Sequence, residues 1–193
     1  KGTTNQFGNP NGHIIRWLEP NGDTAATTFS WDIYLFGARS TADAANVNLS
    51  GLTADNDLSS PDGLWFSRQG VCWIQTDDGA YTDVTNCMLL AAVPGTVGDG
   101  AKKTITNVDG AATKTVDTYV SAPLGDAKLR RFLVGPKDCE ITGIVETPDR
   151  KAIFVNIQHP GEGTSAANFA AGNYISNWPG GGAARPARKT RSR

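Results

Sequence analysis

The sequence predicts an all-β fold that is rich in turns. The 193 residues include 22 glycines and 10 prolines, and no segment shows sustained helical periodicity of its apolar residues. A short hairpin pattern also occurs twice, with its two copies 80 positions apart in the chain. A supersecondary unit that recurs at a fixed offset indicates a repeat architecture.

The first copy of the hairpin lies at 63–76. Residues 63–66 are predicted as one strand, and residues 71–76, which are rich in β-branched and aromatic side chains, as the next. The turn at 67–70 ends on Gly70, which can adopt a positive φ without steric cost. Shifting by 80 places Gly63 on Gly143, Gly70 on Arg150, and Trp73 on Ile153. The second copy therefore spans 140–158.

The segments around the two hairpins complete a larger pattern. The apolar runs 86–92 and 129–134 are predicted as a third and a fourth strand. Four consecutive antiparallel strands followed by a restart are typical of β-propeller blades. Upstream, 13–18 and 27–36 are predicted as the outer half of a preceding blade. The chain then holds about half a blade, one blade and half a blade, within a domain that spans 1–186.

Two segments differ in character from the predicted strands. In 27–36, Phe29, Trp31, Ile33 and Leu35 alternate with polar residues, so they are expected to share one face of a strand. In contrast, 102–127 is poor in large apolar residues and is predicted as an external insertion between the third and fourth strands.

Bulk properties exclude some classes of function. The net charge is -1, which favours neither nucleic acid nor a membrane surface as a partner, and no run is long enough for a membrane span. The basic tail 187–193 is expected to be disordered and solvated. The odd count of three cysteines gives no disulfide framework, and Cys72, Cys87 and Cys139 are expected mainly to pack as small apolar residues.

Candidate site residues follow from the repeat. The offset makes Ser60 equivalent to Glu140 and Asp62 equivalent to Thr142, at the points where the hairpins begin. Carboxylates at matched positions can reach a shared cation. Glu140 stands among apolar neighbours, and a buried acid needs a partner. Turn capping by Asp62 remains an equal alternative.

A second group of acids could also offer oxygen ligands to a hard cation such as calcium. Asp43, Asp55 and Asp57 lie in the polar segment 37–58, although their spacing does not match an EF-hand loop. The simpler interpretation of this segment is a solvated connection between blades.

Longer motifs carry a resemblance to a known family. The chain resembles the C-terminal part of PhoX-type bacterial alkaline phosphatases over nearly its whole length, up to about residue 186. The motifs, in order, are Gly-His-Ile-Ile-Arg-Trp at 12–17, Trp-Asp-Ile at 31–33, Ser-Ser-Pro-Asp-Gly-Leu-Trp-Phe at 59–66, Trp-Ile-Gln-Thr-Asp at 73–77, Arg-Phe-Leu-Val-Gly-Pro at 131–136, Cys-Glu-Ile-Thr-Gly at 139–143 and Phe-Val-Asn-Ile-Gln-His-Pro-Gly-Glu at 154–162.

The resemblance implies a six-bladed propeller that hydrolyses phosphate monoesters, with diesters as a further substrate class. It also implies iron and calcium ions in the central channel and a periplasmic or secreted location, usually reached by the twin-arginine route. Glu140 is carried over as a metal ligand, with Asp62 as a second ligand and Asp138 as a weaker candidate. Lys137 and His159 are expected near the phosphate.

Several alternatives remain open at this stage. Family members carry much more sequence than this chain, so the chain is expected to be a fragment that is inactive alone. It could instead be a binding propeller that keeps Glu140 without phosphatase activity. A third possibility is a non-catalytic assembly component that associates with itself through open strand edges.

Overall fold

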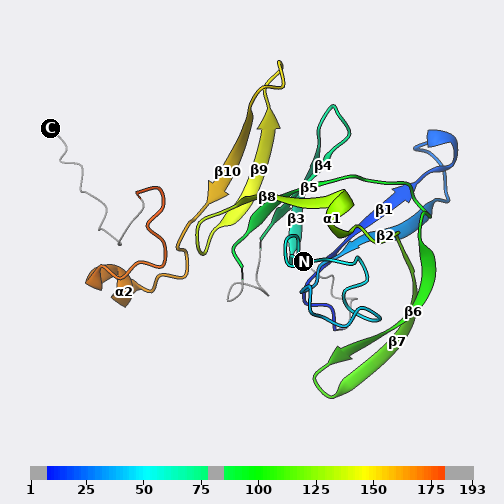
Figure 1. Cartoon of the computed structure of the whole chain (residues 1–193), viewed down its shortest axis with the longest axis horizontal. Helices are drawn as coiled ribbons and strands as arrows, with labels where there is room; N and C mark the ends of the chain where they lie inside the picture. Colours follow the sequence, from blue (N-terminus) through cyan, green and yellow to red (C-terminus); the bar gives the residue numbers. More distant parts are fainter. Residues whose placement is uncertain (1–7, 78–84, 181–193) are drawn as a thin grey trace.

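The computed structural model describes residues 8–77 and 85–180, and its architecture confirms the all-β prediction (Figure 1). Strands dominate, and the few helices are short. The basic tail 187–193 lies outside the described residues. In chain order the elements are β1 (His13–Leu18), η1 (Pro20–Gly22), β2 (Ser30–Phe36), β3 (Pro61–Phe66), β4 (Cys72–Thr76), β5 (Met88–Ala92), β6 (Ala101–Asp109), β7 (Ala112–Val120), α1 (Gly125–Lys128), β8 (Leu129–Val134), β9 (Glu140–Glu146), β10 (Ile153–Gln158) and α2 (Ala166–Ala171).

The strands form three sheets. The central sheet has the order β3-β4-β5-β8 and is antiparallel throughout. All four of its strands lie where the sequence predicts strands. A second sheet has the order β1-β2-β7-β6, and the third is the β9–β10 hairpin. None of these sheets closes on itself within the residues that the structure describes.

The two middle strands of the central sheet, β4 and β5, are largely buried on both faces, to which alternate side chains of a strand point. On one face, Ile74 and Leu90 pack in a core with Tyr34 and Leu35 of β2. On the other face, Leu89 packs with the β9–β10 hairpin, in a core to which the half-buried Trp73 also contributes. The molecule is therefore layered, with the central sheet between its two neighbours.

The two repeated hairpins share a bulge at the predicted equivalent positions. In β3, Pro61 pairs with Thr76 and Gly63 with Gln75, so Asp62 is the extra residue. In β9, Ile141 pairs with Ile157 and Gly143 with Asn156, so the bulge falls at Thr142. β9 also packs against β3 and β4. The two hairpins are thus neighbours with the same local geometry.

The repeat offset changes within the hairpin, and this corrects the sequence alignment. The turn closes from Ser67 to Val71 in the first copy, but from Thr147 to Ala152 in the second. The second turn therefore holds one additional residue. Beyond it the offset is 81, so Trp73 corresponds to Phe154 and not to Ile153.

The predicted external insertion does leave the central sheet between β5 and β8, but it is a long regular hairpin. β6 and β7 pair along their full length and join β2 through a parallel bridge between Ile33 and Val120. Alternating Thr and Lys residues on an exposed ribbon, such as Thr113–Thr115, carry strand propensity without large apolar side chains. Low hydrophobicity therefore concealed these strands.

A second correction concerns β2. A register shift between Ile14 and Ile15 of β1 leaves Tyr34 as an extra residue opposite them. The bulge breaks the alternation, so that Ile33 joins one core cluster while Leu35 joins another. β2 is consequently buried on both sides over its C-terminal half, and no single apolar face is formed.

The described part of the chain contains no helix that is both long and apolar enough to cross a membrane.

Candidate functional site

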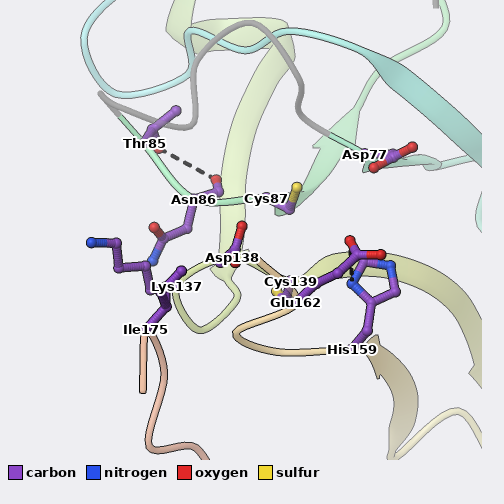
Figure 2. Close-up of a pocket in the computed structure, with 10 residues that line it drawn as sticks. All are labelled: Asp77, Thr85, Asn86, Cys87, Lys137, Asp138, Cys139, His159, Glu162 and Ile175. Atoms are coloured by element: carbon purple, nitrogen blue, oxygen red, sulfur yellow. Dashed lines mark hydrogen bonds and ion pairs between the residues drawn. The ribbon is translucent and has the colours of Figure 1, made fainter. Parts of the chain in front are cut away.

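The open ends of the two repeated hairpins meet at one end of the central sheet. Ser60 accepts a backbone hydrogen bond from Asp77 (3.1 Å), and Glu140 pairs with Gln158 at the equivalent place in the second hairpin. The loops that follow β8 and β10 cover the same end. Together they enclose a cavity of about 170 Å³ (Figure 2). Its lining includes Asp77, Cys87, Lys137, Asp138, His159 and Glu162.

Glu140 does not itself line the cavity but contacts His159, which does. Only 9% of the Glu140 surface is exposed. Its Oε2 atom accepts a hydrogen bond from Gln158 Nε2 at 2.8 Å and lies 3.5 Å from His159 Nε2. The other ring nitrogen, His159 Nδ1, lies 3.1 Å from Glu162 Oε2. The imidazole therefore sits between a buried and an exposed carboxylate, which satisfies the sequence argument that a buried Glu140 needs partners.

Negative charge accumulates around Glu140. Burial raises the pKa of the Glu140 carboxyl group, and the nearby charges of Asp77 and Asp62 raise it further, whereas His159 acts in the opposite direction. A charged carboxylate that raises the pKa of a neighbouring carboxyl group repels its ionised form in the folded state. A cation placed among these carboxylates would relieve that repulsion.

The backbone around the cavity is strained at three residues. Ser60 (φ 48°), Asp138 (φ 57°) and His159 (φ 35°) all have positive φ without being glycine. Such conformations persist where surrounding contacts enforce them, and they cluster at functional sites. At Asp138 the contacts are visible, because its carbonyl oxygen accepts a hydrogen bond from Gly161 N (2.7 Å) and its carboxylate accepts one from Gly163 N.

The structure brings some of the predicted site residues together. Lys137 and His159 both line the cavity, with Lys137 exposed and set apart from His159 (Figure 2). Asp62 does not line it. It is exposed on the bulge of β3, at a distance from which its charge still acts on Glu140. Asp138 holds the loop at 161–163, which is a structural role.

Sequence reasoning missed two of the acids. Asp77 was not predicted as a site residue, because only an offset of 81, and not the predicted offset of 80, aligns it with Gln158. Glu162 was quoted only as part of a longer motif. The geometry of the loop explains its position. Glu162 N donates to the carbonyl oxygen of His159 (3.0 Å), and this turn places the Glu162 side chain beside the imidazole.

Two of the three acids of the segment 37–58, Asp43 and Asp57, have protein partners instead. Asp57 accepts hydrogen bonds from Arg131 (3.0 Å) and from Ser40. Asp43 accepts from the backbone N–H of Ala45 and the side chain of Asn46. These contacts favour the interpretation of the segment as a connection whose acids stabilise turns.

The oxygen donors near Glu140 are of the kind that calcium and ferric iron take. Their arrangement alone does not complete a metal centre, because no three His, Cys, Asp or Glu side chains within 8–77 and 85–180 are grouped so that they could hold an ion. The fit to the implied metals therefore extends to the chemistry of the donors and not to a full coordination shell.

Close packing at the base of the site gives a testable prediction. A Cβ atom added at Gly135 would lie 2.5 Å from Cys139 Sγ and 3.0 Å from Ile141 Cδ1. We expect Gly135→Ala to lower the free energy of unfolding by about 1–3 kcal/mol through overpacking, measured by urea denaturation. Gly143→Ala is the matched control, since its nearest contact would be Asn156 Cβ at 3.6 Å. Equal stabilities of the two variants would contradict the packing argument.

Comparison with known proteins places this geometry in a family. Residues 3–161 match the family model described as alkaline phosphatase PhoX. No curated protein matches the chain significantly. A solved structure, Pseudomonas fluorescens PhoX in complex with vanadate, a transition state analogue, is 32% identical with a TM-score of 0.58. The match covers 81% of this chain and 23% of that chain, so the chain spans about a quarter of the relative's length. The match of the family model over most of the sequence shows that the chain belongs to the PhoX alkaline phosphatase family.

Proposed function

We propose that this chain is part of a metal-dependent phosphatase that hydrolyses phosphate monoesters, and diesters as a second class, outside the cytoplasm. The single observation that carries the proposal is the effect of the Asp77 and Asp62 charges on Glu140, across two matched hairpins, in a chain of this family. The vanadate bound to the solved relative supports phosphoryl transfer as the chemistry.

Glu140 is the residue that would hold a cation from this chain, with Asp62 and Asp77, whose charges act on it, as further oxygen donors. Calcium and iron are the metals that the family resemblance suggests. When bound, such cations neutralise phosphoryl oxygens and acidify a bound water. Gln158 and His159 contact Oε2 of Glu140 and thereby fix the carboxylate that would hold the cation.

Lys137 and His159 would act on the substrate. Lys137 is exposed at the cavity and carries a positive charge that attracts an anionic phosphate. His159 is oriented by Glu140 on one side and Glu162 on the other, so its ring can hold or pass a proton at the cavity wall. Both roles are proposals for the same site.

The three sheets fit a propeller in which the central sheet is one whole blade. In this arrangement β9–β10 is the inner half of the next blade, and β1–β2 is the outer half of the preceding one. The support is the layered packing of the sheets and the shared bulges at Asp62 and Thr142. The remaining blades and metal ligands would come from sequence outside this chain, which leaves the chain inactive by itself.

Chelation tests the proposed function directly. The protein that carries this sequence is expected to hydrolyse p-nitrophenyl phosphate and to lose most of its turnover after thorough treatment with EDTA and an iron chelator. Readdition of calcium and iron should restore the turnover. Elemental analysis should show that the metal content falls and recovers together with the turnover. Unchanged turnover in protein shown to be metal-free would exclude the proposal. The alternative of a non-catalytic binding or assembly protein gains no specific observation from the fold.

A further inference from the structure

Two cysteines from different layers of the fold line the same cavity. Cys87 directly precedes β5 and Cys139 directly precedes β9, and both are buried. They belong to one core cluster, together with Leu89 and Ile141. Figure 2 shows both side chains on the cavity wall. The sequence gives no sign of this arrangement, because the two positions are far apart in the chain.

Gly135 is a neighbour of both cysteines. Its N–H donates to the carbonyl oxygen of Cys87 at 2.8 Å. A Cβ atom on Gly135 would lie 2.5 Å from Cys139 Sγ and 3.2 Å from the Cys87 carbonyl oxygen. The absence of a side chain at Gly135 therefore lets the Cys139 sulfur pack against Gly135, whose N–H is bonded to the Cys87 carbonyl oxygen.

The third cysteine lies elsewhere and serves as an internal reference. Cys72 is also buried, but it packs in the core on the opposite face of the central sheet, with Ile74 and Leu90. Because a disulfide needs Cα atoms within about 7 Å, the sheet that separates Cys72 from Cys139 keeps this pair apart.

We propose that Cys87 and Cys139 form a disulfide when the chain folds in an oxidising compartment. The S–S bond forms by exchange with an oxidised thiol such as glutathione disulfide, or with an exported thiol–disulfide oxidoreductase. The two cysteines give up two protons and two electrons, and the disulfide of the oxidant is reduced to two thiols. The proposal rests on the extracytoplasmic location proposed above, but not on phosphatase activity.

The bond would tie the central sheet to the β9–β10 hairpin immediately next to Glu140, and would thereby fix the spacing of the two halves of the site. It would form before folding is complete. Both thiols are buried in the folded chain, so an oxidant has little access to them there. The same burial would protect a formed disulfide from reductants.

Thiol counting after refolding tests the proposal. The chain is unfolded and reduced, and is then refolded either in glutathione redox buffer or in dithiothreitol. It is next denatured and alkylated, and its mass is measured. In redox buffer we expect a single alkylated cysteine, a mass lower by the two hydrogen atoms lost, and a peptide that joins Cys87 to Cys139. In dithiothreitol all three cysteines should be alkylated. The oxidised chain should also melt at the higher temperature.

Variants separate the proposed pair from other pairings. Cys72→Ser should still lose two thiols in redox buffer, whereas Cys87→Ser and Cys139→Ser should keep both remaining thiols. Three alkylated cysteines in the refolded wild type, a cross-link that includes Cys72, or separate glutathione adducts on Cys87 and Cys139 would each overturn the proposal. Wild-type chain expressed with a bacterial export signal and alkylated at lysis gives the same readout without refolding.

Discussion

Replacing Glu140 by Gln is expected to have opposite effects on activity and on stability. In the protein that carries this sequence, loss of the carboxylate should lower phosphatase turnover at least about 100-fold, as removal of groups that support a metal does, and should lower the bound metal content. The metal-free chain should become more stable at neutral pH, because the change removes a buried charge that Asp77 and Asp62 repel.

The direction of the stability change follows from the pKa of Glu140. This pKa is raised in the folded chain from its ordinary value of 4.5, so the folded state binds the proton more tightly than the unfolded state. The stability that Glu140 contributes is present below 4.5 and is lost as the pH rises through the raised value. Urea denaturation at several pH values should show this loss in the wild type but not in Glu140→Gln.

Glu146→Gln is the matched control for this prediction. Glu146 ends the same strand that Glu140 begins, so both variants change one carboxylate of β9 to its amide. The control should retain the turnover, the metal content and the pH dependence of stability of the wild type. Full turnover in Glu140→Gln would remove Glu140 from the proposed site, and an unaltered pH profile would contradict the repulsion among the acids.

Local signals in the sequence were sufficient to locate most strands. The bounds of β1 and β8 match their predictions, because short apolar and β-branched runs there are bracketed by Gly and Pro. β6 and β7 were not predicted, since their segments are rich in Thr and Lys and form a ribbon that is held mainly by the backbone pairing between the two strands. The bulge at Tyr34 could not be predicted either, because it depends on the register in which β1 pairs with β2.

The candidate site could be predicted only in part, because its geometry arises from pairing between distant residues. The offset of 80 located Glu140 and Asp62, but the extra turn residue before Ala152 hid the equivalence of Asp77 and Gln158. The positions of Cys87 and Cys139 were likewise invisible in sequence, because their place in one core cluster depends on how two sheets pack.

The second large effect concerns a buried ion pair on the other side of the central sheet. Asp32 is 1% exposed, and Arg16 binds both of its carboxylate oxygens at 2.7 and 2.8 Å. The same guanidinium binds Asp99 at 2.6 Å and the carbonyl oxygen of Pro94. Arg16 thus connects β1, β2 and the loop that leads into β6. In Arg16→Met, Asp32 would remain buried with the N–H of Gly98 as its remaining donor among the hydrogen bonds described here.

We therefore expect Arg16→Met to lower the free energy of unfolding by about 3–5 kcal/mol, the usual cost of leaving a buried charge uncompensated, measured by urea denaturation. Lys102→Met is the control, because Lys102 pairs with Asp117 at a similar 2.8 Å but both side chains are exposed, and its effect should be small. The double variant Arg16→Met/Asp32→Asn should recover part of the lost free energy of unfolding, since it also removes the buried Asp32 charge that would otherwise be left without Arg16 as its ion-pair partner. If Arg16→Met and Lys102→Met lower the free energy of unfolding by equally small amounts, burial does not strengthen the Arg16–Asp32 pair. Packing alone would then hold β1 and β2 against the central sheet.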